Sequence, residues 1–152
     1  MDEPLLEPGR PQRAVGHLGD GVQGVGFSHR VGTETFIPFL QRLLQDGGMF
    51  IRNGSGALMI SYVAAGRLIG YYEPHINAWD CLAGIVLAQE AGCICNDFLA
   101  ADGLRQGNPI VVAGPRLFPV LMAAIGASDP QAPQWQRAAH PAASPAPAET
   151  PT

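Results

Sequence analysis

Residues 52–98, RNGSGALMISYVAAGRLIGYYEPHINAWDCLAGIVLAQEAGCICNDF, decide the fold of this chain. Ser55 is a residue type that caps helices, and it predicts a helix that Gly66 stops in the left-handed conformation that glycine favours. Leu68–Tyr72 predicts a strand. Gly92 ends a second helix, which is predicted by helically spaced apolar residues, namely Trp79, Leu82, Ala83, Val86 and Leu87.

The residues before this stretch continue the alternation of strands and helices. Val22–Phe27 and Met49–Arg52 are apolar enough to predict two strands. Between them, apolar residues at helical spacing predict a helix with Thr35 as its N-cap and Gly47 as its stop.

The residues after it show the same alternation. Cys93–Phe98 and Pro109–Ala113 predict two more strands. A helix should follow, with Pro115 at its first position, a kink at Pro119 and Gly126 after its last turn. Strands that alternate with helices in this way predict an α/β layered domain.

Composition divides the chain into three parts. Its 152 residues leave room for one domain, and 47% hydrophobic residues suffice for a core. We expect an irregular N-terminal segment at 1–21, the α/β domain at 22–126 and a Pro/Ala-rich disordered tail at 127–152. The acidic start MDEPLLEP is unlike a signal peptide, and the chain has no run of about 18 apolar residues. We therefore expect a cytoplasmic protein with reduced cysteines and no membrane partner.

The charge of the chain argues against several functions. A formal net charge of -4 opposes a nucleic-acid or anionic-membrane surface that is held by charge. All nine cationic side chains are arginines, so a Walker A phosphate loop and a Schiff-base lysine are excluded within this sequence.

Two short motifs are poor candidates for a site. Residues 19–24, GDGVQG, match the GxGxxG pattern of dinucleotide-binding proteins, but an apolar strand rather than a helix follows them. Cys93 and Cys95 form a CxC pair on a predicted strand, and no second pair of ligands stands at zinc-site spacing. We interpret the two cysteines as small buried hydrophobes.

Glu73 and Asp80 are the acids that point to a ligand site. Glu73 ends a predicted strand and Asp80 falls in the first turn of the next helix, so both should lie at the carboxyl edge of the sheet, where open α/β folds bind ligands. A carboxylate at a helix N-terminus can hold a hard cation such as Mg²⁺. In a purely structural alternative, Asp80 caps its helix and Glu73 is a solvated strand end. Spacing alone leaves both interpretations open.

Several motifs together resemble the C-terminal half of the inositol monophosphatase family of Mg²⁺-dependent sugar and inositol phosphatases. The family's WDxxAG signature appears at 79–84, and GSGAL stands upstream at 54–58. Between them lie YVAAGR at 62–67 and GYYE at 70–73, and QGNPIVVAGPR at 106–116 is similar to the family's closing strand and helix start. The resemblance implies the C-terminal subdomain of the layered αβαβα sugar/inositol phosphatase fold.

The resemblance also implies roles for individual residues. Asp80 matches the aspartate that ligates Mg²⁺ and touches the substrate, and Glu73 matches the acid that binds sugar or inositol hydroxyls. Gly54, Ser55 and Gly56 match the turn that lines the substrate pocket. Gly56 replaces the family's usual alanine, which should slightly loosen the pocket and leave its N–H groups in place.

One family signature has no counterpart in this sequence. The Asp-Pro-x-Asp-Gly-Thr run and the preceding glutamate pair, which supply most of the metal ligands, have no match in residues 1–21. One aspartate cannot support two-metal phosphate hydrolysis, so the chain is expected to be inactive alone. We expect pairing with an N-terminal half or a homodimer.

The function implied is hydrolysis of a small polyol or sugar phosphate monoester. Inositol, fructose bisphosphate, adenosine bisphosphate and histidinol phosphates all remain open as substrates. The alternative is a catalytically inactive remnant or interaction module.

Overall fold

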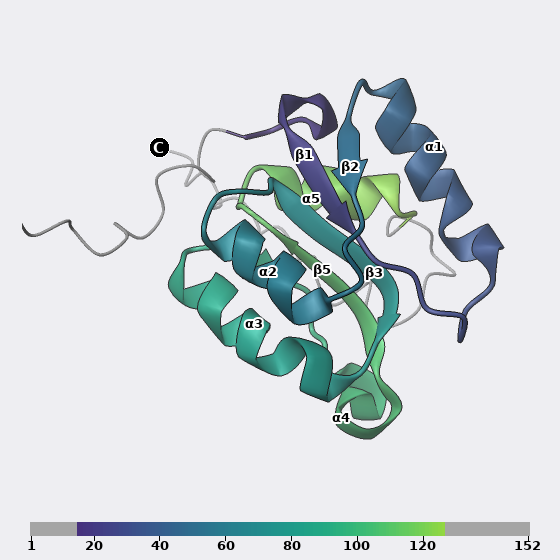
Figure 1. Ribbon diagram of the computed structural model, residues 1–152, viewed down its shortest axis with the longest axis vertical. Coiled ribbons are helices and arrows are strands. Elements are labelled where there is room, and N and C mark those ends of the chain that lie inside the picture. Colours follow the sequence, from purple (N-terminus) through teal and green to yellow (C-terminus); the bar gives the residue numbers. More distant parts are fainter. Residues whose placement is uncertain (1–14, 127–152) are drawn as a thin grey trace, which may run out of the picture.

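A computed structural model describes residues 15–126 (Figure 1). The predicted Pro/Ala-rich tail at 127–152 and most of the predicted N-terminal segment lie outside the described residues. Within residues 15–21, the chain makes one turn of 3-10 helix at Leu18–Asp20, which leads into the first strand.

A five-stranded mixed sheet forms the centre of the fold, in the order β2-β1-β3-β5-β4. β1 lies between β2 and β3 and is parallel to both, whereas β5 is antiparallel to β3 and to β4. β2 and β4 are therefore the two edges. The strands are β1 Val22–Val25, β2 Met49–Ile51, β3 Gly70–Ile76, β4 Ile94–Cys95 and β5 Asn108–Ala113.

Helices cover both faces of the sheet, which makes an α/β/α sandwich and confirms the predicted fold class (Figure 1). On one face lie α2 (Gly56–Ala64) and α3 (Ala78–Glu90). On the other lie α1 (Ile37–Gln45) and α5 (Leu117–Ala124). A loop with a short 3-10 turn and the four-residue helix α4 (Gly103–Gln106) connects β4 to β5.

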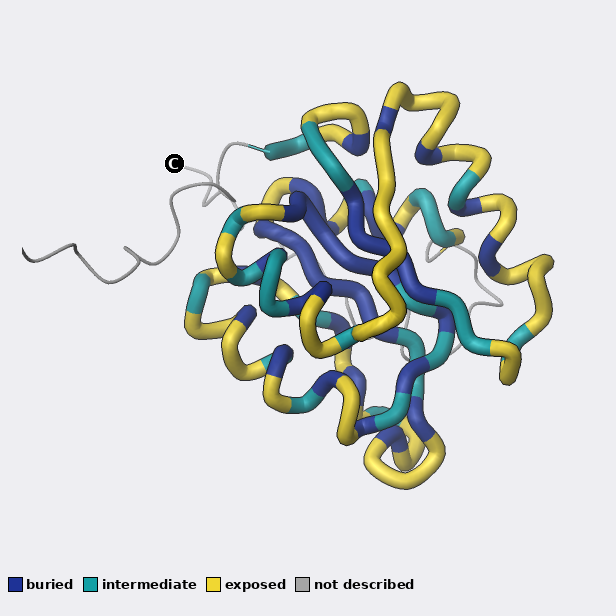
Figure 2. The backbone as a smooth tube through the Cα atoms, in the orientation of Figure 1, coloured by how far each residue is buried: buried dark blue, intermediate teal, exposed yellow. Residues whose placement is uncertain are grey.

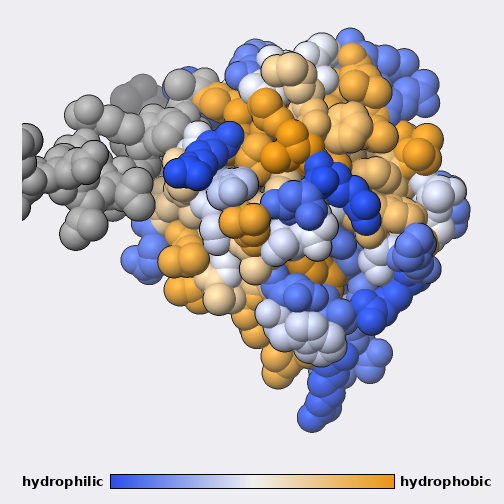
Figure 3. All heavy atoms as spheres, viewed as in Figure 1, coloured by the Kyte–Doolittle hydropathy of each residue, from blue (hydrophilic) through white to orange (hydrophobic). Residues whose placement is uncertain are grey.

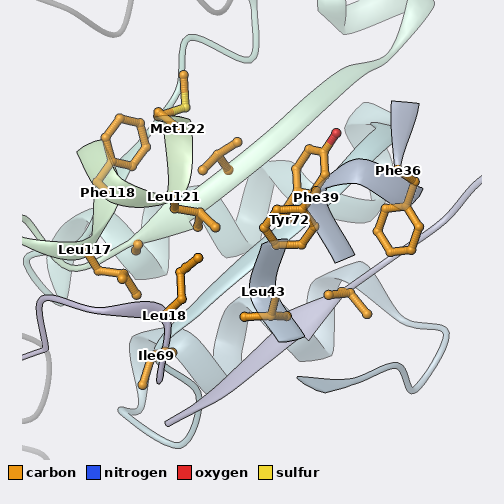
Figure 4. Packing of buried hydrophobic residues seen from close by; sticks show 13 residues of the cluster. Leu18, Phe36, Phe39, Leu43, Ile69, Tyr72, Leu117, Phe118, Leu121 and Met122 are labelled. Carbon is orange, nitrogen blue, oxygen red and sulfur yellow. The ribbon is translucent and has the colours of Figure 1, made fainter. Parts of the chain in front are cut away.

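Each face of the sheet has its own hydrophobic core, because successive strand residues point to opposite faces. Tyr71 and Val112 pack with α2 and α3, whereas their neighbours Tyr72 and Val111 pack with α1 and α5. Figure 4 shows the second core, where Tyr72, Phe39 and residues of α5 meet. Figure 2 shows the central strands buried, while β2 is exposed along its whole length.

The predicted ends of the helices are largely confirmed. Ser55 caps α2, because its Oγ accepts a hydrogen bond of 3.3 Å from the Leu58 N–H. The four glycines that were predicted to stop helices all have positive φ just past a helix end, the left-handed conformation that favours glycine; they are Gly47, Gly66, Gly92 and Gly126.

The predicted starts of two helices are wrong. Thr35 lies in a 3-10 turn, where its hydroxyl donates to the Gly32 carbonyl, and Phe36 is the N-cap residue of α1. α5 begins at Leu117, two residues after Pro115. Pro119 is therefore the third helical residue, where an N–H has no acceptor within the helix, and the helix continues past it to Ala124.

Two strands also differ from prediction. β3 does not end at Glu73 but runs on to Ile76, because β5 continues to pair with it as far as Ile76 and Asn108. The register shifts between Glu73 and Ile76, and an irregularity of this kind accommodates Pro74, which has no N–H to donate.

The strand predicted over Cys93–Phe98 is reduced to Ile94–Cys95. The side chain of the next residue, Asn96, forms hydrogen bonds with the backbone of β5. Its Oδ1 accepts from the Val111 N–H at 2.7 Å, and its Nδ2 donates to the Pro109 carbonyl at 3.0 Å. A side chain thus takes over hydrogen bonds that a continuing strand would make.

Candidate functional site

A small cavity of about 50 Å³ lies where β1 and β2 end and α2 begins. It contains three of the predicted site residues together with groups from β1, from β3 and from the residues that follow β1 and β2. Its lining residues are Val25, Gly26, Phe27, Arg52, Gly54, Ser55, Tyr71 and Glu73.

The turn before α2 is held by local hydrogen bonds. The Ser55 N–H donates to Asn53 Oδ1 at 2.9 Å, and Gly54 between them has a φ of 85°. A residue with a side chain would be strained in that conformation. This conformation explains why a glycine stands at position 54 in the lining of the cavity.

Gly56, the first residue of α2, allows close contact with β3 and α3. A Cβ at this position would overlap Ile76 Cδ1 and would lie 3.4 Å from the Asp80 carbonyl oxygen. Ile76 thus fills the space that a larger residue would take. Gly56 is not among the residues that line the cavity, and the expected loosening of the pocket at this position stays a prediction.

Glu73 is half-buried at the cavity, and its carboxylate accepts a hydrogen bond from the Tyr71 hydroxyl. Burial raises the pKa of Glu73 above its usual range, while the Tyr71 bond and the Arg52 charge act in the opposite direction. Glu73 is therefore not a solvated strand end, and the structural alternative is wrong for this residue.

Asp80 is the third residue of α3 and is exposed. The N-cap of α3 is Asn77, and no group within residues 15–126 donates a hydrogen bond to the Asp80 carboxylate. The alternative in which Asp80 caps its helix is therefore wrong. Asp80 does not line the cavity, but its charge is close enough to raise the pKa of Glu73.

The described residues contain no group of three His, Cys, Asp or Glu side chains that could hold a metal ion. Asp80 offers a carboxylate that accepts no hydrogen bond from residues 15–126, which suits a hard cation. The described residues can thus supply one ligand to a Mg²⁺ ion, but they do not form a complete Mg²⁺ site.

Arg52, Tyr71 and Gly26 also lie at the cavity and were not singled out in the sequence. Arg52 follows β2 directly, and its Nη2 donates to the Phe27 carbonyl at 3.3 Å. Strand alternation was a usable signal for Tyr71, because residues two apart share a face of a strand and Tyr71 precedes Glu73 by two.

The two weak motifs have structural roles. Residues 19–24 form the end of a 3-10 turn and the first residues of β1, with no helix after them. Cys93 is buried, Cys95 is half-buried, and burial raises the pKa of the Cys95 thiol to about 12. Thiols of this kind behave as small apolar groups.

The sequence model of the inositol monophosphatase family matches residues 18–129. The chain belongs to this family. The resemblance seen in the WDxxAG and GSGAL motifs is thereby confirmed.

Individual relatives agree with this assignment. Nus factor SuhB of Vibrio cholerae is 37% identical over 90 residues, which cover 59% of this chain and 34% of that protein. Mycobacterium tuberculosis SuhB has a structure that superimposes with a TM-score of 0.63 at 35% identity, covering 74% of this chain and 44% of the other. Inositol monophosphatase from Anabaena gives a TM-score of 0.63 at 26% identity, covering 78% and 48%.

This chain spans about a third of the length of the curated relatives that it matches, for example 34% of the Vibrio protein. Within residues 15–126, no helix has the length and apolar character that crossing a bilayer requires.

Proposed function

We propose that this chain supplies one wall of the active site of a Mg²⁺-dependent phosphatase that hydrolyses a small polyol or sugar phosphate monoester. The observation that carries the proposal is the meeting of Glu73, Gly54 and Ser55 at one cavity, with Asp80 at the start of the adjacent helix. Membership of the inositol monophosphatase family supports the reaction class.

The substrate hydroxyls would contact the cavity wall. Glu73 would accept a hydrogen bond from a hydroxyl, since a half-buried carboxylate is a strong acceptor. The N–H groups at Gly54 and Gly56, at the start of α2, would donate to hydroxyl oxygens, whereas the Ser55 N–H already donates to Asn53 Oδ1. Arg52 adds a positive charge to the lining of the cavity, which favours an anionic substrate.

Asp80 would be this chain's ligand to Mg²⁺, and the bound ion would activate a water and stabilise the leaving alkoxide. A single carboxylate gives Mg²⁺ few protein ligands, so the isolated chain should bind the ion only at about millimolar concentration or weaker. Titration calorimetry measures this. Tight stoichiometric binding would reveal ligands that are not identified above.

The remaining ligands would come from an N-terminal half that carries the Asp-Pro-x-Asp-Gly-Thr signature. Exposed apolar side chains support such a partner. Trp79 at the start of α3 is 76% exposed, and Met49, Phe50 and Ile51 are all exposed along β2. Figure 3 shows apolar side chains between polar ones on the face of the molecule that is turned to the viewer in Figure 1.

The test combines this chain with a matching N-terminal half and measures phosphatase activity. Asp80→Asn should remove most of the activity, because asparagine keeps the shape of the side chain and loses the charge that holds the cation. Glu90→Gln is the matched control, since it makes the same change at an exposed position at the other end of α3. Turnover near that of the unaltered protein in Asp80→Asn at limiting Mg²⁺ would overturn the role of Asp80.

A second candidate function is that of a non-catalytic interaction module, which the incomplete set of metal ligands among the described residues favours. If the chain needs a partner, residues 1–126 should self-associate or bind a hydrophobic dye at about 100 μM, a range where exposed apolar surface drives aggregation. A dye-negative monomer in analytical ultracentrifugation would show a self-sufficient domain and favour the module.

The expectations of a cytoplasmic location and of no nucleic-acid partner stay predictions. Relatives at 35% to 37% identity carry the name Nus factor SuhB rather than that of a phosphatase. A gel-shift assay of the purified chain with RNA and duplex DNA at physiological salt checks the second expectation, and saturable binding would contradict it.

A further inference from the structure

Tyr71 stands behind the carboxylate of Glu73. Its side chain is only 1% exposed and belongs to the core under α2 and α3. Its hydroxyl extends to the cavity, where it donates a hydrogen bond to Glu73 Oε2. Residues 71 and 73 lie two apart in β3, and this spacing brings both side chains to the same face of the sheet.

Gly26 leaves the room in which this pair lies. It follows β1 directly, and its N–H donates to the Tyr72 carbonyl at 2.9 Å, which holds its backbone against β3. A Cβ on Gly26 would overlap the Glu73 carboxylate and the Tyr71 hydroxyl. A side chain at this position would force the Glu73 carboxylate, the Tyr71 hydroxyl or both to shift.

The hydrogen bond occupies one oxygen of Glu73 and leaves the other available. No donor among residues 15–126 bonds to Glu73 Oε1, and the side chain lines the cavity. Burial raises the pKa of the Tyr71 hydroxyl far above its usual range, so this hydroxyl keeps its proton and acts as a donor to the carboxylate.

We propose that Tyr71 is a positioning residue that holds Glu73 through Oε2 so that Oε1 faces the substrate hydroxyls, with Gly26 providing the space. This inference rests on the proposed function, in which Glu73 binds those hydroxyls. Fixing the carboxylate in advance lowers the entropic cost of binding, because the acceptor does not have to be ordered by the ligand.

Tyr72 supplies an internal control. It is adjacent in β3 and 3% exposed, but it faces the other side of the sheet. There its ring packs edge-on against Phe39, with ring centroids 4.9 Å apart, and no bond joins its hydroxyl to a described carboxylate. Loss of its hydroxyl therefore tests tyrosine removal without removing the donor to Glu73.

The experiment is a ¹³C NMR titration of the glutamate carboxyl groups in the full chain, with the Glu73 signal assigned by its absence in Glu73→Gln. Tyr71→Phe should move the Glu73 titration midpoint upward by about one pH unit, because one hydrogen bond to a charged group is lost. Tyr72→Phe should leave the midpoint unchanged. An unchanged midpoint in Tyr71→Phe, or an equal shift in both variants, would overturn the proposal.

Gly26→Ala tests the hydrogen bond between Tyr71 and Glu73 in a second way. It keeps the tyrosine and should also displace the Glu73 midpoint, while circular dichroism reports whether the fold is retained. If Tyr71→Phe does not fold, a displaced midpoint in folded Gly26→Ala supports the proposal, and an unchanged one overturns it.

Activity separates this proposal from the proposed function. In the chain combined with an N-terminal half, Tyr71→Phe should raise KM more than it lowers kcat, because the substrate-binding carboxylate is no longer fixed. A loss in kcat with no change in KM would overturn the positioning role. A displaced midpoint without any hydrolysis by the unaltered pair would support the Tyr71–Glu73 geometry and refute the proposed function alone.

Discussion

The two faces of the sheet use neighbouring tyrosines in different ways. On the face covered by α1 and α5, Tyr72 packs among Phe36, Phe39 and the apolar residues of α5, and its ring only fills space. On the face covered by α2 and α3, Tyr71 is buried to the same degree, but its hydroxyl bonds Glu73 at the cavity. The first face contains a hydrophobic core, whereas the second also contributes to a polar cavity.

The difference shows that burial and residue type do not determine the role of a side chain. Both tyrosines lie in β3 and both are almost fully buried. What differs is the face of the sheet, and with it the groups that stand at the carboxyl ends of β1 and β2. Substitutions that change one face at a time test this difference.

The largest effect is expected on the packing face. Phe39→Ala should lower the free energy of unfolding by about 3–5 kcal/mol, because it leaves a cavity between α1, Tyr72 and Phe36. Leu44→Ala is the control on the same helix, because Leu44 is exposed and should cost less than about 0.5 kcal/mol. Urea unfolding followed by circular dichroism measures both. Equal losses would mean that this face is not a packed core.

A smaller loss is expected on the site face at Gly56. Gly56→Ala should cost about 1–3 kcal/mol, because its new methyl group meets Ile76 Cδ1. Ile76→Val removes that carbon atom, so the double variant should be more stable than the sum of the two single changes predicts. Strict additivity in this cycle would show that Ile76 does not limit the space at Gly56.

The packing face also contains a polar defect that can be removed. Gln23 in β1 is fully buried, and its Oε1 has no hydrogen-bond partner among the described residues. Gln23→Met keeps the length of the side chain and removes the unsatisfied carbonyl, at the loss of the 3.3 Å bond from Nε2 to the Gly24 carbonyl, so stability should rise by at most about 1 kcal/mol. A loss of stability in urea unfolding would show that the amide is satisfied in solution.

The smallest effect concerns pH and the site face. Burial raises the pKa of Glu73 in the folded state, so between its unfolded and folded pKa values the folded protein binds more protons. Glu73 should therefore make stability fall as the pH rises through that window. Glu73→Gln keeps an acceptor for Tyr71 and removes the titration, so it should be more stable than the unaltered chain at neutral pH and not at about pH 3. Parallel stability curves of the two proteins against pH would contradict this.

The candidate site was foreseen in part. Gly54, Ser55 and Glu73 do meet at one cavity, and Asp80 lies in the first turn of its helix as predicted. The binding roles of these residues stay predictions. Tyr71 and Gly26 were missed because their importance lies in contacts across β1 and β3, which the order of residues along the chain does not reveal.

By itself the sequence determined the family, the layered α/β class and most helix ends. The cap at Ser55 and the stop at Gly66 depend on residues within one turn, so a local pattern is enough to find them. Only the tertiary structure decided that β3 continues past Glu73, that β4 stops at Cys95 and that Ile76 fills the space beside Gly56. Those features depend on hydrogen bonds from β5 and on packing between elements far apart in the chain, and such long-range partners leave no periodic mark in the sequence.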